Sequence, residues 1–207
     1  MQSVTEHFLL ETRDDCSIIH LISADRINRL TLAGVQSLSV LMEELAEART
    51  TKTNGKPLII TGNDEHFSVG ADLSEIAALS SAEALEFARS GQRLIRQIDE
   101  LPGQVYAAIS GYCIGGGLDL ALACDFRVCA ANAIFGHRGA ALGLITGWGG
   151  TQRLGALLGR GRALQMFAAA EKLGAAEALD AGLVSEIAAN PVARCMELIA
   201  EKQPHVP

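Results

Sequence analysis

Two glycine-centred segments constrain the fold of this chain more than any other feature. The first, residues 66–73, reads HFSVGADL and follows a short apolar run, Leu58–Thr61. The second, residues 109–120, reads ISGYCIGGGLDL. Each passes from an apolar run typical of a buried strand, through glycine, into a sequence typical of a helix. Strands and helices that follow one another in this way predict a mixed α/β or α+β domain.

Glycine-rich turns between a strand and a helix can also carry chemistry. The first N–H groups of a helix have no acceptor within the helix, and they lie at the positive end of its dipole. Glycine lets a ligand approach this backbone closely. One such turn can bind an anion, and two turns that face each other could hold a developing oxyanion. The alternative is that these glycines serve only tight turns and close helix packing.

The remaining periodicities predict the other elements. Apolar runs at residues 7–13 and 16–23 predict two strands of a hairpin, and residues 105–110 and 126–130 predict further strands. A helix is expected after Thr31, which has the character of an N-cap.

A second helix is expected over residues 82–101, because Ser80 and Glu83 have the spacing of a capping box. Residues 52–56 are polar and indicate a loop. From Gly149 onward, the pattern predicts helices that are separated by glycines.

Composition and charge restrict the class of protein. Of the 207 residues, 49% are hydrophobic and 20% are charged, which is typical of a globular protein with a sizeable core. The net charge of −7 argues against broad electrostatic binding to nucleic acid or to an anionic membrane. Five cysteines without a CxxC pair indicate reduced thiols, and the start MQSVTEHF does not resemble a signal peptide. We therefore expect a cytoplasmic protein, and the scattered histidines predict no metal site.

Together, the motifs resemble the crotonase, or enoyl-CoA hydratase/isomerase, superfamily. The matching stretches occur in the family's order: HFSVGADLSEI, AAISGYCIGGGLDLALACDFRVCAANAIFG, LGLITGWGGTQRLGALLGR and EKLGAAEALDAGLVSEI. The resemblance implies a spiral of ββα turns over residues 1–190 and a short C-terminal helical segment over residues 191–207. It also implies an acyl-CoA thioester as substrate, no cofactor beyond that CoA, and assembly as a homotrimer or hexamer. Relatives usually continue for about two more helices, so a shortened C-terminal helical region is expected. Three alternatives are open: a more open site, oligomer contacts in place of a lid, or a chain that is a shortened form of a longer protein.

The same resemblance assigns roles to individual residues. It makes the backbone N–H groups of Ala71 and Gly116 an oxyanion hole for the thioester carbonyl. It places Asp119 where hydratases of the family commonly carry a catalytic glutamate, although an aspartate here could also simply brace the helix. Gly139 stands where a second glutamate is common, and glycine has no acid or base to offer. The positions that the resemblance implies in substrate binding are Gly70, Asp72, Leu73, Gly115, His137 and Gly139.

Three candidates could fill the place of the missing second acid. His137 would share a face with residue 139 if this segment is extended, and an imidazole titrates near neutrality. A bound bicarbonate, which the resemblance suggests, and a bound water are the other two candidates. The alternative is that His137 only packs and has no chemical role. Gly139→Glu is expected to raise hydratase activity. Trp148 is expected to pack near the pocket or near an oligomer contact.

The expected activity is hydration, dehydration or double-bond isomerisation of a CoA thioester. Another enolate reaction of the same fold is the first alternative, namely thioester hydrolysis, decarboxylation, or the making or breaking of a carbon–carbon bond. A non-catalytic acyl-CoA-binding protein is the second alternative. Neither nucleic acid nor a membrane is expected as a partner.

Overall fold

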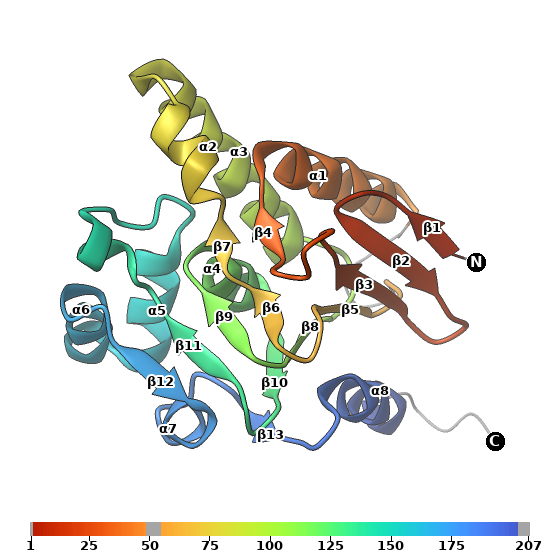
Figure 1. Ribbon diagram of the computed structural model, residues 1–207. Coiled ribbons are helices and arrows are strands. Elements are labelled where there is room, and N and C mark those ends of the chain that lie inside the picture. The colour runs from red at the N-terminus through yellow and green to blue at the C-terminus, as the bar shows by residue number, and fades with distance from the viewer. Residues whose placement is uncertain (1, 49–54, 203–207) are drawn as a thin grey trace.

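The computed structural model of the protein describes residues 2–48 and 55–202 (Figure 1). Most of the loop expected at 52–56, and the last five residues of the expected C-terminal segment, lie outside the described residues. In the part of the chain that is described, none of the helices combines the length and the apolar character that crossing a membrane requires.

A seven-stranded sheet forms the centre of the described structure, in the order β1-β2-β3-β5-β8-β10-β13. The first three strands pair antiparallel, and the pairs from β3 to β13 are parallel. β5 and β8 are buried along their whole length, as is typical of parallel strands that are covered on both faces. The bounds are β1 (Gln2–Val4), β2 (Phe8–Thr12), β3 (Ser17–Leu21), β5 (Leu58–Thr61), β8 (Val105–Ile109), β10 (Phe126–Cys129) and β13 (Glu186–Ile187).

Two smaller sheets lie beside the large one. The strands β6, β9 and β11 pair parallel in that order, and β12 adds to β11 in the antiparallel sense. The short strands β4 and β7 form a separate parallel pair. The bounds are β4 (Arg29–Leu30), β6 (His66–Ser68), β7 (Gly70–Ala71), β9 (Tyr112–Ile114), β11 (Ile134–Gly136) and β12 (Lys172–Gly174).

The chain repeats one pattern three times. A strand of the large sheet, a strand of the second sheet and a helix occur in this order as β5-β6-α2, β8-β9-α4 and β10-β11-α5. The short strand β7 precedes α2, and a 3-10 turn precedes α5. This is the mixed α/β fold and the spiral of ββα turns that the sequence predicts. The helices are α1 (Leu32–Glu47), α2 (Leu73–Ala78), α3 (Ser81–Asp99), α4 (Gly116–Ala123), α5 (Gly150–Leu158), α6 (Arg160–Ala168), α7 (Ala175–Asp180) and α8 (Pro191–Lys202), with a 3-10 turn at Gly139–Leu142.

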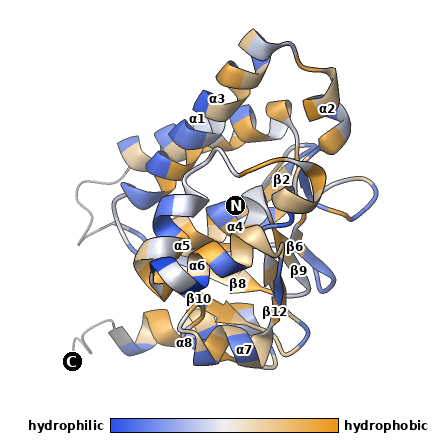
Figure 2. Cartoon of the chain, turned by 90° about the vertical axis from the view of Figure 1, so that its left-hand side faces the viewer, coloured by the Kyte–Doolittle hydropathy of each residue, from blue (hydrophilic) through white to orange (hydrophobic). Residues whose placement is uncertain are grey.

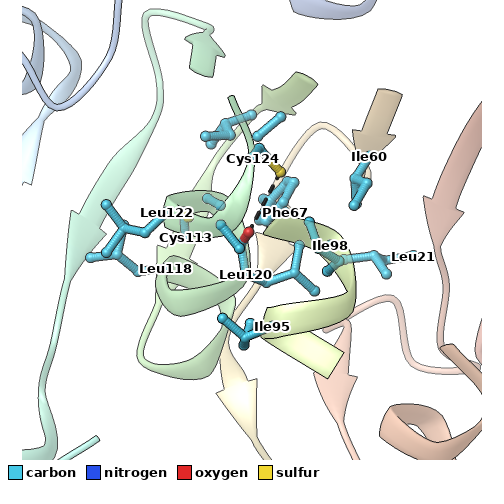
Figure 3. Close-up of a cluster of buried hydrophobic side chains, with 14 of the residues drawn as sticks. Leu21, Ile60, Phe67, Ile95, Ile98, Cys113, Leu118, Leu120, Leu122 and Cys124 are labelled. Carbon is cyan, nitrogen blue, oxygen red and sulfur yellow. Dashed lines mark hydrogen bonds between the residues drawn. The ribbon is translucent and has the colours of Figure 1, made fainter. Parts of the chain in front are cut away.

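Apolar side chains pack on both faces of the large sheet. The larger cluster joins the sheet to α1, α3 and α4, and Figure 3 shows Leu118 and Leu120 of α4 within it. α4 is the most buried helix, because every residue from Gly117 to Ala123 is buried. α3 instead alternates between hydrophilic and hydrophobic residues along its length (Figure 2). On the other face, α8 places Cys195 and Ile199 in a smaller cluster.

Several local predictions are confirmed. The hairpin forms between β2 and β3, and the Thr31 hydroxyl caps α1 by accepting from Gly34 N at 3.1 Å. The capping box of Ser80 and Glu83 begins α3. The strands of the two smaller sheets were not predicted, except for the extended segment before Gly139. Each is only two or three residues long, which is too short to show an alternating pattern.

Candidate active site

The two glycine-centred turns lie directly against each other. Gly70 has a φ of +85°, and a Cβ on it would lie 2.8 Å from both Gly116 N and Ile114 O. Both the backbone conformation and this close approach therefore require glycine. The contact joins the start of α4 to the strand β7, although the two are separated by more than 40 residues of sequence.

A buried hydrogen-bond network fixes the backbone before Ala71. Asn28 lies in the left-handed region with a φ of 50°, and its Nδ2 donates to His66 O at 2.8 Å. The Ser68 hydroxyl donates to Asn28 O at 2.8 Å and accepts from Gly70 N at 3.1 Å. Pairing of β7 with β4 adds a second restraint. The peptide at Ala71 is therefore held from two sides.

The start of α4 is equally well defined. Gly115 N donates to Gly136 O at 2.9 Å, and Gly115 O accepts from Asp119 N at 3.0 Å. Gly116 is the first residue of α4, so its N–H has no acceptor within the helix. Trp148 packs over this end, because a Cβ on Gly116 would lie 2.6 Å from the indole ring.

A cavity of about 350 Å³ lies beside these two turns. Its wall is mostly apolar and comes from α2, α3, the start of α4 and the segment before α5. The residues of the predicted site that line it are Ala71, Leu73, Gly115, Gly116, Asp119, His137 and Gly139. The predicted residues outside the lining are Gly70 and Asp72.

Asp72 lies at the start of α2, outside the cavity lining. Its carboxylate is the N-cap of α2 and accepts from Ser74 N at 2.8 Å and from Glu75 N at 3.4 Å. The hydrogen bonds from Ser74 lower the pKa of this carboxyl below its ordinary value. Asp72 therefore stabilises the start of α2, the helix that borders the cavity. Gly70, the other predicted residue outside the lining, packs against the backbone of Gly116.

Buried polar groups gather at one end of the cavity. Asp119 is 1% exposed and His137 is 3% exposed, and their Oδ1 and Nε2 atoms lie 3.2 Å apart. The Thr146 hydroxyl donates to Asp119 Oδ2. Gly150 covers the pair, since a Cβ there would lie 2.0 Å from Oδ1 and 2.8 Å from Nε2. A carboxylate and an imidazole in contact can exchange a proton with a bound ligand.

The segment around Gly139 departs from the extended path that was assumed. β11 ends at Gly136, and the chain turns at Arg138 into the 3-10 turn. His137 and Gly139 both line the cavity, but they do not share the face of a strand. A Cβ on Gly139 would lie 2.6 Å from Leu144 O. The expectation that Gly139→Glu raises hydratase activity therefore conflicts with the packing of this loop.

Two residues of the site were missed from sequence. Thr146 and Gly150 both lie in the stretch LITGWGG, which carries the resemblance, yet nothing local to that stretch indicates that they approach Asp119. Trp148, from the same stretch, packs beside the pocket as expected, with its ring 5.3 Å from that of Phe87.

Comparison with known proteins identifies the family of the chain. The sequence model of the family described as "Enoyl-CoA hydratase/isomerase" matches residues 19–202. The chain belongs to this family. It is accordingly an enzyme of the enoyl-CoA hydratase/isomerase type, and the resemblance to the crotonase superfamily is confirmed.

Similar members of the enoyl-CoA hydratase/isomerase family come from diverse organisms. The chain is 37% identical over 187 residues to a crotonyl-CoA hydratase of Syntrophomonas wolfei, covering 88% of this chain and 69% of that protein. It is 35% identical over 199 residues to the enoyl-CoA isomerase/hydratase fer4 of Mycosarcoma maydis, covering 92% and 73%.

Solved structures show the same crotonase fold. A Bacillus anthracis enoyl-CoA hydratase superposes with a TM-score of 0.87 at 30% identity, over 94% of this chain and 76% of that one. A Thermoplasma volcanium enoyl-CoA hydratase gives a TM-score of 0.86 at 29% identity, over 97% and 79%.

Proposed function

We propose that this enzyme hydrates an enoyl-CoA thioester, dehydrates the corresponding hydroxyacyl-CoA, or shifts a double bond, in the cavity beside β7 and α4. One observation carries the proposal. The buried carboxylate of Asp119 stands three residues after Gly116, near one turn of α4, and both line the same cavity as Ala71. Acid/base chemistry and main-chain donors thus meet at one place.

The backbone N–H groups of Ala71 and Gly116 are the proposed oxyanion hole. Removal of an α-proton, or addition of water to the β-carbon, places negative charge on the thioester oxygen. Two preorganised donors stabilise that charge more strongly than they stabilise the ground state, and each is worth roughly 3–4 kcal/mol of barrier. The direct contact of Gly70 with Gly116 supports a fixed distance between the two donors.

Asp119 is the proposed acid/base. Its neighbours in the cavity wall are largely apolar, which suits an acyl chain beside a single polar end. Correct positioning of a general acid/base contributes about 10²–10⁴-fold in rate. We expect Asp119→Asn to lose turnover by a factor in that range, while the affinity for acyl-CoA changes little.

The kinetic test uses a panel of enoyl-CoA and hydroxyacyl-CoA substrates, with rates and affinities measured for each. Asp180→Asn, an exposed aspartate at the end of α7, is the matched control. Unchanged turnover in a folded Asp119→Asn variant, on a substrate that the wild type processes, would reject Asp119 as the acid/base.

A binding test addresses the carbonyl separately. CoA thioesters should bind more tightly than the matched thioethers, which lack the oxygen that the two N–H groups would contact. Equal affinity across the matched series would remove the argument for an oxyanion hole.

The assembly and the compartment are part of the proposal. Large apolar side chains remain exposed around the mouth of the cavity, including Leu73, Leu142 and Ile145, which is 71% exposed. Apolar patches of this kind usually mark contacts, which supports a homotrimer or a hexamer. Five buried cysteine thiols support a reducing, cytoplasmic setting.

A further inference from the structure

Two buried polar atoms at the end of the cavity have no hydrogen-bond partner among the described residues. They are Asp119 Oδ1 and His137 Nε2, and they lie 3.2 Å apart without forming an aligned hydrogen bond. A buried polar group without a partner destabilises the folded state. Two such atoms side by side in a substrate cavity therefore call for a functional explanation.

The other oxygen of Asp119, Oδ2, already accepts a hydrogen bond. Trp148 N donates to Thr146 Oγ1 at 3.3 Å, and the Thr146 hydroxyl donates in turn to Asp119 Oδ2. A hydroxyl carries one hydrogen, so Oδ2 acts as an acceptor in this chain of bonds. A proton taken up by the carboxylate therefore rests on Oδ1, on the side of the imidazole.

The imidazole is held on two sides. The backbone of α5 closes over it at Gly150, where a Cβ would lie 2.8 Å from Nε2. The ring of Phe167, from α6, lies 4.9 Å from the imidazole ring. This packing holds Nε2 within 3.2 Å of Asp119 Oδ1.

We propose that Asp119 and His137 act as one proton-carrying pair, in which Thr146 holds the carboxylate and His137 shares its proton. The proposal rests on the function proposed above and adds to it a group that Gly139 cannot supply. His137 is a positioning residue in this scheme, because it acts on the substrate through Asp119. The pair accepts one proton during each turnover and gives it back before the turnover ends.

In both reactions, the pair returns the proton that it accepts. In hydration, the oxygen of water bonds to the β-carbon, its proton passes to the pair, and the electrons of the double bond move to the thioester oxygen. The enolate then collapses as the α-carbon takes a proton from the pair. In isomerisation, one carbon gives its proton to the pair and another carbon receives it. The pair is unchanged after each turnover, and no other reagent is consumed.

Few other charges face the pair. Arg138 is the other charged side chain in the cavity lining. On the β9 side, burial, with a smaller contribution from Asp119, raises the pKa of Cys113 well above its ordinary value, so this thiol stays neutral. Arg162, on α6, forms an ion pair with Glu171, which follows this helix, at 2.8 Å. α5 and α6 present the uncharged Gly150 and Phe167 to the pair.

The first test needs no substrate. The ¹⁵N signals of the His137 ring are followed by NMR and assigned by their loss in His137→Gln. Asp119→Asn should shift these signals, because the carboxylate oxygen 3.2 Å from Nε2 is replaced. Unchanged ring signals in folded Asp119→Asn would overturn the pair.

The second test uses turnover. His137→Gln keeps an N–H donor near Asp119 but cannot share a proton, so kcat should fall by about 10-fold or more with little change in KM. The limb of the pH–rate profile that reports the pair should also move. Thr146→Val should show the same signature, and Thr146→Ser, which keeps the hydroxyl, should recover most of the rate.

The outcomes separate the two proposals. A His137→Gln variant with wild-type kcat and an unmoved pH profile would overturn the pair, even if Asp119→Asn is inactive. Turnover that survives Asp119→Asn would instead reject the proposed role of Asp119, whatever the NMR spectrum shows.

Discussion

Gly150 opens α5, and its backbone lies against Asp119 and His137. A methyl group there would overlap Oδ1, at 2.0 Å. We expect Gly150→Ala to push the carboxylate away from the imidazole, to lower turnover by about 10-fold or more, and to destabilise the fold by about 1–3 kcal/mol. Steady-state kinetics and urea unfolding measure the two effects.

Gly155 provides the matched control within the same helix. Nothing lies within 4 Å of a Cβ at Gly155, so Gly155→Ala should stabilise the protein by about 0.4–1 kcal/mol through the unfolded chain and leave turnover unchanged. Equal behaviour of the two alanine variants would show that contact with Asp119 does not matter.

The candidate site was predictable only in part at the level of residues. Ala71, Gly116 and Asp119 could be singled out because the family resemblance, carried by the two glycine-centred motifs, assigns roles to these positions. The structure brings them to one cavity. Their catalytic roles remain predictions. Thr146 and Gly150 could not be found, because they reach Asp119 through the packing of α5 on α4, which no local pattern encodes.

At the level of elements, the connection between the consecutive strands β6 and β7 depends on a single hydroxyl. Ser68 is completely buried and bonds both Asn28 O and Gly70 N. Ser68→Ala should destabilise the protein by about 1–3 kcal/mol, because two buried groups lose their partner. It should also lower kcat, since the peptide at Ala71 loses its support. Urea unfolding and kinetics report the two effects.

A cap on the far side of the sheet provides the control for that substitution. Asn190 Oδ1 accepts from Ala193 N at 3.0 Å at the start of α8. Asn190→Ala should cost about 1 kcal/mol of stability without any change in kcat. If Ser68→Ala behaved in the same way, the hydroxyl would support only the fold.

Elements with their own local signals were the ones that sequence could predict. α1 and α3 carry both an amphipathic repeat and a capping residue, and both begin within a residue or two of the predicted place. β9 and β12 exist because distant strands pair with them. Such short strands are specified by tertiary context, which is not visible in a single sequence.

Across the whole molecule, the five buried thiols should lower the free energy of unfolding as the pH becomes alkaline. Burial raises the pKa of each thiol from an ordinary value of 9.0. Between pH 9 and the raised value, the unfolded chain loses the proton while the folded chain keeps it. The free energy of unfolding should therefore fall, by about 1.4 kcal/mol per pH unit for each thiol. The raised values are about 11 for Cys16 and Cys129 and about 12 for Cys124 and Cys195.

Urea unfolding between pH 8 and about pH 10.5 measures this slope. Cys195→Ala should make the slope of the free energy of unfolding against pH shallower by the contribution of one thiol, because that site no longer titrates. A free energy of unfolding that stays flat over this range would contradict the burial of the thiols.

The exposed apolar side chains at the cavity mouth predict self-association. We expect light scattering to give the mass of a trimer or of a dimer of trimers, because Leu142 and Ile145 would otherwise remain in water. Substituting Ile145 with aspartate should weaken the assembly if this patch lies in the contact. A stable monomer over a wide concentration range would contradict the proposed assembly.

Trp148 is the single tryptophan of the chain, and its ring packs on Gly116, next to the proposed oxyanion hole. The emission of an indole depends on the polarity and the quenching groups around it, so the intrinsic fluorescence of this protein comes chiefly from one wall of the cavity. A ligand that enters the cavity should change that signal without any label. The affinities of thioesters, thioethers and inactive variants can therefore be read on one optical scale, including ligands that the enzyme does not turn over.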